Sequence, residues 1–154
     1  MTDRRVLIIG LGLIGGSIAL AIKKKHDATI IGYDVNHVQA KLAKSLNIID
    51  EAVSSLEDGA KDASLIIIAI PVIQTENIID EIASLPLKDN VIITDVGSTK
   101  TAIVEKSAVF QNKNAVFIGG HPMAGSHKTG IAASKAHLFE NAFYILTPSK
   151  DCHK

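Results

Sequence analysis

Three glycines near the start of the chain have the spacing of a loop that binds phosphate. Gly10, Gly12 and Gly15 follow the short β-branched run 6–9, and an apolar helical stretch, 14–22, overlaps the last of them. In a dinucleotide fold the first glycine permits a tight turn, the second lets backbone N–H groups approach a pyrophosphate, and the third lets the helix pack close to the strand. The spacing therefore predicts a dinucleotide-binding loop.

An acidic residue at the end of the next apolar run favours one nucleotide over another. The run 29–33 ends in Asp34, about 20 residues beyond the last glycine, where such folds place an acid that accepts both ribose hydroxyls. A carboxylate there repels a 2′-phosphate, and no arginine stands at 35–37 to attract one. Asp34 therefore predicts NAD as the cofactor. The unpaired N–H groups of the first helical turn, at Leu13 and Ile14, would bind its pyrophosphate.

Two other interpretations of this segment remain to be weighed. A purely structural glycine turn would give no reason for an acid at Asp34. Arg4 and Arg5, followed by an uncharged run and by Ala19-Leu20-Ala21, also imitate a secretory signal peptide. Glycines spaced for a phosphate loop make a poor apolar segment for such a peptide, so dinucleotide binding is favoured.

A histidine in a second glycine-rich stretch is the candidate for proton transfer. The segment 119–130, GGHPMAGSHKTG, holds four glycines, and Pro122 keeps His121 extended. A neutral imidazole accepts a proton at cellular pH, as hydride removal from a carbon that bears a hydroxyl requires. The spacing alone supports two interpretations of His121 equally: a proton acceptor, or a histidine that only bonds a backbone carbonyl. A metal site at His121 and His127 is disfavoured, because no nearby cysteine or carboxylate completes it.

The segment 95–100, DVGSTK, supplies a second set of candidates at the same edge of the predicted sheet. It has the pattern of a capped helix start. In the functional interpretation, Ser98 orients the imidazole of His121 or bonds a substrate hydroxyl. Lys100 either pairs with a substrate carboxylate or is solvated.

Strands and helices alternate along the chain, which predicts a doubly wound, mainly parallel α/β sheet of the Rossmann type. Ligands of such sheets lie outside the carboxyl ends of the strands, where Ile70, Pro71 and Gly97 join the cofactor-binding candidates. The expected strands are 6–9, 29–33, 52–53, 65–70, 91–94, 115–118 and 143–146. The expected helices are 14–22, 36–46 with Val38, Leu42 and Leu46 on one face, 72–84 burying Ile73, Ile78, Ile79 and Ile82, 99–110 and 131–138.

Composition excludes several classes of protein. The 154 residues predict one domain, 1–154, and with 47% hydrophobic but only 4% aromatic residues its core must be aliphatic. Sixteen basic and sixteen acidic residues cancel, which argues against nucleic-acid and membrane-surface partners. The N-terminal segment aside, no apolar run approaches the ~20 residues of a membrane span. A single cysteine, Cys152, fits a reducing cytoplasm.

Several motifs together resemble one family. GLGLIGGS, the acid at Asp34, DVGSTK, GGHPMAGSHKTG and LFENAFYILTP look like the nucleotide-binding domain of the prephenate dehydrogenase family, which includes arogenate dehydrogenases. The resemblance spans nearly the whole chain. It implies the NAD-dependent oxidative decarboxylation of prephenate to 4-hydroxyphenylpyruvate, on the route to tyrosine. Hydride leaves the ring carbon that bears the hydroxyl, and loss of carbon dioxide makes the ring aromatic.

The resemblance also assigns roles to individual residues. It places the catalytic histidine, which takes the hydroxyl proton, on His121, and the serine that bonds this histidine and the substrate on Ser98. Recognition of the substrate side chain falls on Gly125 and Ser126. Other members carry Thr-Glu where this chain has Ser126-His127, so a role given to that glutamate does not transfer.

Finally, the resemblance implies a helical, dimer-forming domain that follows the nucleotide-binding one and supplies an arginine for the substrate carboxylates. Since the sequence stops at Lys154, we expect an isolated cofactor domain that binds NAD and turns over prephenate poorly. The alternatives are an arogenate dehydrogenase, another two-domain NAD(P)-dependent hydroxyacid dehydrogenase or imine reductase, and a non-catalytic NAD(H)-binding module.

Overall fold

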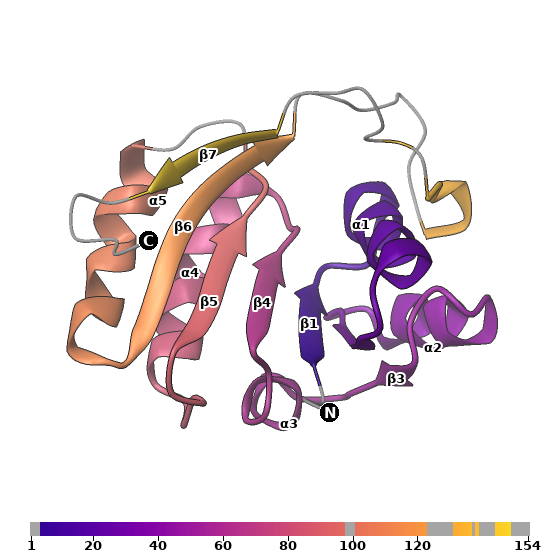
Figure 1. Cartoon of the computed structure of the whole chain (residues 1–154), viewed down its shortest axis with the longest axis horizontal. Helices are drawn as coiled ribbons and strands as arrows, with labels where there is room; N and C mark the ends of the chain where they lie inside the picture. The colour runs from indigo at the N-terminus through magenta and orange to yellow at the C-terminus, as the bar shows by residue number, and fades with distance from the viewer. Residues whose placement is uncertain (1–3, 98–100, 123–130, 137, 139–143, 149–154) are drawn as a thin grey trace.

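The computed structural model describes residues 4–97, 101–122, 131–136, 138 and 144–148. In these residues seven strands form one sheet in the order β3-β2-β1-β4-β5-β6-β7, parallel throughout except for the antiparallel pair of β6 and β7 (Figure 1). This confirms the doubly wound, mainly parallel fold of the Rossmann type. The strands are β1 Arg5–Ile9, β2 Thr29–Tyr33, β3 Glu51–Ala52, β4 Leu65–Ile68, β5 Val91–Asp95, β6 Ala115–Pro122 and β7 Tyr144–Pro148.

Helices connect the strands and pack on both faces of the sheet. In the view of Figure 1, α4 and α5 lie behind the sheet, and α1 and α2 lie at the other end of it. The helices are α1 Leu13–Lys25, α2 His37–Ser45, α3 Leu56–Ala60, α4 Val72–Ala83 and α5 Thr101–Lys106, and the 3₁₀ turns are η1 Ser107–Asn112 and η2 Ile131–Ala133. None of the described helices is long and apolar enough to cross a membrane.

The sheet is buried between two aliphatic clusters because successive side chains of a strand point to opposite faces. In β1, Leu7 and Ile9 belong to the cluster under α3, α4 and α5, whereas Val6 and Ile8 belong to the cluster under α1 and α2. Leu7 and Ile8 are both fully buried. The run 6–9 is therefore apolar at every position, as a strand covered on both faces requires.

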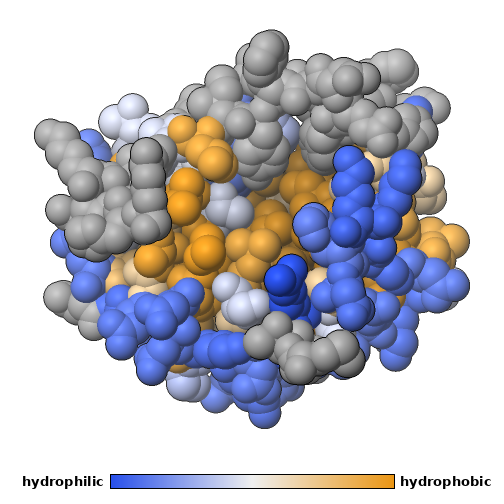
Figure 2. Space-filling view, in the orientation of Figure 1, coloured by the Kyte–Doolittle hydropathy of each residue, from blue (hydrophilic) through white to orange (hydrophobic). Residues whose placement is uncertain are grey.

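The half of the sheet around β5 and β6 is less completely covered. Ile92 of β5 pairs with Leu65 of β4 and Val116 of β6, and it is 42% exposed. Figure 2 shows hydrophobic residues gathered in the centre of this view, with hydrophilic residues along the lower edge. The alternation in β5, with Val91 and Ile93 buried and Ile92 exposed, reflects this unequal covering.

Two predicted apolar faces were wrong in part. Val38, Leu42 and Leu46 share a face, but they are 70%, 38% and 47% exposed, because α2 packs through the small side chains of Ala40 and Ala43. In α4, Thr75, Ile79 and Ile82 form the buried stripe. Ile73 lies off that stripe and is 85% exposed, whereas Ile79 and Ile82 are buried as predicted and Ile78 packs against the cluster.

Other expected boundaries also differ. The predicted helix 131–138 is only the turn η2, because the backbone N–H of Lys135 donates to Ser17 Oγ of α1 at 2.9 Å instead of continuing a helix. The short helix α3 was not predicted; Ser55 caps it by accepting from the Asp58 N–H at 3.2 Å. The predicted helix 99–110 is α5 followed by η1. Strand β4 ends at Ile68, before residue 70, and β6 continues to Pro122 because it pairs with β7.

Candidate functional site

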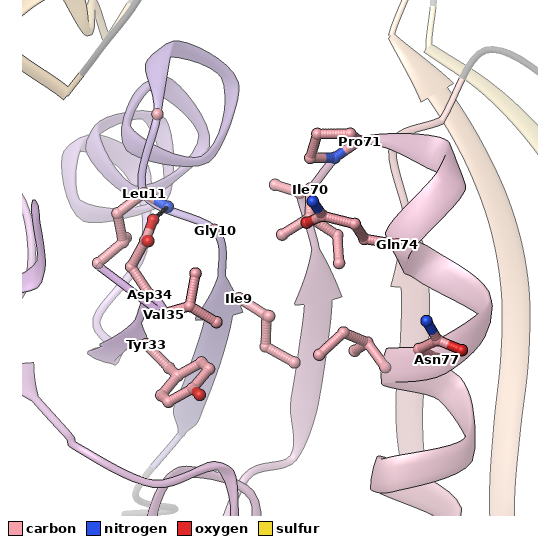
Figure 3. Close-up of a pocket in the computed structure, with 13 residues that line it drawn as sticks. Ile9, Gly10, Leu11, Tyr33, Asp34, Val35, Ile70, Pro71, Gln74 and Asn77 are labelled. Atoms are coloured by element: carbon pink, nitrogen blue, oxygen red, sulfur yellow. Dashed lines mark hydrogen bonds between the residues drawn. The ribbon is translucent and has the colours of Figure 1, made fainter. Parts of the chain in front are cut away.

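A pocket of about 370 Å³ opens at the carboxyl ends of β1, β2 and β4, where the strand order of the sheet reverses. This is the position at which doubly wound folds bind ligands. Figure 3 shows side chains from β2 on one wall and from α4 on the other. The described residues that line it are Ile9, Gly10, Leu11, Gly12, Tyr33, Asp34, Val35, Ala69, Ile70, Pro71, Gln74, Asn77 and Ile78.

Asp34 is the one charged residue among those lining residues. Its Oδ2 accepts from the Leu11 N–H at 2.8 Å, and its Oδ1 accepts from the Asn36 N–H at 2.9 Å. Each carboxylate oxygen has a second lone pair, so the fixed carboxylate can still accept from two hydroxyl groups. A half-buried negative charge in a pocket where none of the described lining residues is basic suits a neutral diol and repels a phosphate.

Two of the three loop glycines are required by the protein itself. Gly10 has φ +97°, and a Cβ there would collide with the Ala69 carbonyl oxygen. A Cβ on Gly15 would collide with the Gly10 carbonyl oxygen, so α1 approaches β1 closely only because this side chain is missing. A Cβ on Gly12 would meet no atom of the described residues within 4 Å. The space beside Gly12 is therefore open to a ligand.

The first turn of α1 presents donors to that open space. The first helical hydrogen bond runs from the Gly16 N–H to the Gly12 carbonyl at 2.9 Å, which leaves the N–H groups of Leu13, Ile14 and Gly15 without an acceptor inside the helix. The N-cap is Gly12, whose lack of a side chain leaves these donors uncapped. The helix dipole adds partial positive charge at this end, so the turn favours a bound anion.

The carboxyl end of β4 forms the opposite wall. Ile70 and Pro71, two residues predicted to bind the cofactor, line the pocket. Gln74 and Asn77 of α4 also line it, and the sequence analysis missed both. Pro71, Gln74 and Asn77 follow one another at intervals of three residues, which puts them on one helix face. Two polar amides at this interval were the signal that could have revealed the face.

His121 lies near the carboxyl end of β6, opposite Ile145 of β7. Its side chain is partly buried, and its Nδ1 atom is buried with no hydrogen-bond partner among the described residues. It does not line the pocket. Strands β4 and β5 separate it from β1, and three strand spacings amount to about 14 Å, a distance that an extended dinucleotide spans.

A second acid, Asp95, forms hydrogen bonds to two backbone segments at the edge of the sheet beside His121. Asp95, at the end of β5, is fully buried; its Oδ2 accepts from the Gly97 N–H and its Oδ1 from the Gly120 N–H, both at 3.1 Å. The N–H of Gly97, a predicted cofactor-binding residue, is therefore engaged within the protein. The sequence analysis assigned no role to Asp95, although an acid that ends a buried strand was a signal.

The other predicted residues fall outside the part of the chain that the structure describes. These are Ser98, Lys100, Gly125, Ser126 and His127. In the described part, no three histidine, cysteine, aspartate or glutamate side chains are grouped so as to hold a metal ion.

The sheet order, the glycine loop and the placed acid define a dinucleotide-binding domain of the Rossmann type. Residues 18–154 match the family model "prephenate dehydrogenase, nucleotide-binding domain", and the chain belongs to this family.

Individual relatives agree with that assignment. Prephenate dehydrogenase of Bacillus subtilis is 51% identical over 150 residues, which is 97% of this chain and 40% of the relative. The crystal structure of prephenate dehydrogenase from A. aeolicus, in complex with hydroxyphenyl propionate and NAD+, has a TM-score of 0.88 and 32% identity, covering 99% of this chain and 53% of that one. Synechocystis arogenate dehydrogenase has a TM-score of 0.86 and 32% identity, covering 95% of this chain and 50% of that one. The chain thus spans about half of these relatives or less.

Proposed function

We propose that this chain is the NAD-binding part of an enzyme that oxidises and decarboxylates prephenate to 4-hydroxyphenylpyruvate. The proposal rests on the family and on relatives that are themselves prephenate dehydrogenases. The structural observation that carries it is the Asp34 carboxylate, fixed by two backbone N–H groups in a pocket that no described basic residue lines. We propose the cytoplasm as its location and a dimer, formed through the family's helical domain, as its assembly.

The described residues fit an adenine dinucleotide. Asp34 would accept the hydroxyls of the adenosine ribose, and apolar side chains such as Val35 and Ile70 would flank the base. The uncapped turn at Leu13 and Ile14 would donate to the pyrophosphate, which approaches over Gly12. This arrangement favours NAD over NADP, because a 2′-phosphate would meet the Asp34 carboxylate.

In the proposed reaction His121 accepts the proton of the substrate hydroxyl. NAD, when bound, would accept the hydride that leaves the ring carbon bearing this hydroxyl. The bond to the ring carboxylate then breaks, carbon dioxide leaves, and the ring becomes aromatic. Ser98 would orient the imidazole, and Gly125 with Ser126 would contact the substrate side chain, as the family resemblance implies. A neutral imidazole is the form that can take the proton.

Nucleotide selectivity is tested by titrating the chain with NAD and with NADP in parallel and following binding by calorimetry. We expect NAD to bind at least about tenfold more tightly, a preference of about 1.4 kcal/mol. Equal affinity for the two nucleotides would remove the argument from Asp34.

Substrate choice is tested by adding prephenate or arogenate to the NAD complex and following absorbance of the reduced nicotinamide. We expect slow oxidation of prephenate by this chain, because a dicarboxylate needs cationic partners and none lines the described pocket. Fast turnover would show that the chain supplies those groups itself. Faster oxidation of arogenate than of prephenate would favour the alternative substrate.

A further inference from the structure

The sheet divides beside His121. The backbone pairing of β5 with β6 ends at Thr94 and Ile118, and beyond that point β6 pairs with β7 as far as Pro122. Strand β5 stays with β4 instead, because the Val96 N–H donates to the Ile68 carbonyl at 3.1 Å. Two chain segments therefore separate at the carboxyl edge of the sheet, and each carries a part of the candidate site.

The side chain of Asp95 spans this division. Its Oδ2 accepts from the Gly97 N–H, on the segment that leaves β5, and its Oδ1 accepts from the Gly120 N–H, on the segment that continues β6. Both distances are 3.1 Å, and the residue is fully buried. Where the backbone hydrogen bonds between β5 and β6 end, the Asp95 carboxylate therefore connects the two segments. Its contact on β6 is Gly120, the residue before His121.

A buried carboxylate is a costly way to join two strands. Removing it from water is unfavourable unless donors compensate its charge, and two backbone N–H groups do so here. Both donors face the same side chain, which accepts through Oδ1 and through Oδ2. An amide of the same shape would place an NH₂ group against one of the two N–H groups. The site therefore requires two acceptor oxygens and not merely a polar side chain of this size.

We propose that Asp95 is a positioning residue for His121: by holding the Gly120 N–H it fixes the β6 backbone next to the imidazole, relative to the corner at Gly97. The inference rests on the proposed function, in which His121 accepts the substrate proton. Asp95 itself contacts neither substrate nor cofactor in this scheme. It sets where the imidazole stands relative to the segment that follows β5.

The chain offers a matched control at the opposite end of the sheet. Asp50 also accepts from the backbone N–H of a strand residue, Ile30, at 2.8 Å, and it lies 3.3 Å from the ammonium group of Lys23. Asp50 directly precedes β3, and Asp50→Asn removes a carboxylate that accepts from a strand backbone, as Asp95→Asn does, but far from His121. Hydrogen exchange at buried amides of β1 reports a loss of general stability in either variant, whereas a loss of positioning would move the His121 resonances only in Asp95→Asn.

The test is an NMR comparison of the whole chain and its Asp95→Asn and Asp50→Asn variants, with and without NAD. In Asp95→Asn we expect the His121 ring resonances to move and hydrogen exchange at Gly120 to accelerate at least about tenfold more than at buried amides of β1. In Asp50→Asn the His121 resonances stay in place and exchange accelerates at Ile30. Unmoved His121 resonances in Asp95→Asn, or equal movement in both variants, would overturn the proposal.

The wild-type chain provides a second measurement that needs no variant to fold. A scalar coupling across the hydrogen bond, between the Gly120 amide nitrogen and the Asp95 carboxyl carbon, is expected; its absence would also overturn the proposal. Titrations with NAD and prephenate on the same sample separate the two ideas. A chain that neither binds NAD nor oxidises prephenate, yet shows this coupling and the variant shifts, would contradict the proposed function and leave the link from Asp95 to His121 standing.

Discussion

The Oδ2 atom of Asp34 accepts a hydrogen bond from the backbone N–H of Leu11 at 2.8 Å. Asp34, the acid that follows β2, therefore fixes the backbone of the glycine loop that follows β1. In the proposed function the same carboxylate would also accept the ribose hydroxyls, so one side chain would contribute both to ribose selection and to the shape of the phosphate loop.

The first prediction follows from this double role. Replacing Asp34 with serine should weaken NAD binding roughly tenfold to a hundredfold, because charge-assisted hydrogen bonds contribute about 1.5–3 kcal/mol each. Part of that loss comes through Leu11, whose N–H then lacks its acceptor. Calorimetric titration measures the dissociation constant. Asp50→Asn is the control and should leave it unchanged; an unchanged constant in Asp34→Ser would exclude Asp34 from the site.

The second prediction separates the loop glycines. Gly12→Ala should fold with an almost unchanged melting temperature, since its Cβ meets no atom of the described part of the chain within 4 Å. It should nevertheless bind NAD at least about tenfold more weakly, a loss of about 1.4 kcal/mol. Gly15→Ala should lose about 1–3 kcal/mol of stability, because its Cβ would collide with the Gly10 carbonyl. Thermal melts and NAD titrations of both variants check this. Full NAD affinity in Gly12→Ala would show that the open space is not the path of the pyrophosphate.

The third prediction concerns His121. In an assay that detects prephenate oxidation, His121→Asn should lower the rate by roughly 10² to 10⁴, the usual contribution of a general base, while NAD affinity stays the same. His26→Asn is a suitable control, because His26 follows α1 at the opposite end of that helix from the glycine loop. A sensor module would lose nothing in either variant. An enzyme that relies on a lysine would lose little in His121→Asn.

The fourth prediction concerns stability and pH. Lys106 of α5 lies 2.8 Å from Asp80 of α4, and the hydrogen bond to Asp80, with its charge, raises the pKa of Lys106 above its ordinary value of 10.5. A raised pKa in the folded state means that the stabilisation is complete below that value and disappears as the pH rises through the folded pKa. The pair is exposed, so its effect is small and is screened by salt.

Thermal melts of the wild type and Lys106→Gln across a pH series test this. The melting temperature of the wild type should be slightly higher at neutral pH. The difference should shrink as the pH rises above 10.5 and through the raised pKa of Lys106, and it should also shrink in high salt. A difference that persists at alkaline pH would point to packing of the lysine stem as its cause.

Much of the fold and one part of the site could be predicted, because both depend on local spacing. The glycine loop and the run 6–9 each have one structural solution, and the distance to Asp34 follows from the length of the helix and strand between them. The helix faces were harder to predict. Periodicity identifies the stripe at Thr75, Ile79 and Ile82, but only packing shows that α2 approaches the sheet through Ala40 and Ala43.

The parts that could not be predicted depend on contacts between distant segments. Gln74 and Asn77 line the pocket only because α4 lies beside the carboxyl end of β1. The role of Asp95 depends on the division between β5 and β6, which no local pattern encodes. The prediction of a helix over 131–138 was wrong for the same reason, because the Lys135 N–H donates to Ser17 Oγ of α1.

At two consecutive glycines, Gly15 and Gly16, α1 packs closely against the loop after β1 and against the segment at η2. A Cβ on Gly15 would strike the Gly10 carbonyl, and one on Gly16 would strike Ser134 and Ile131. We therefore expect the amino end of this helix to move little when an anion binds. A rigid receptor loses little conformational freedom on association. The heat and rate of nucleotide binding should then report the ligand's own desolvation and ordering, rather than any rearrangement of the protein.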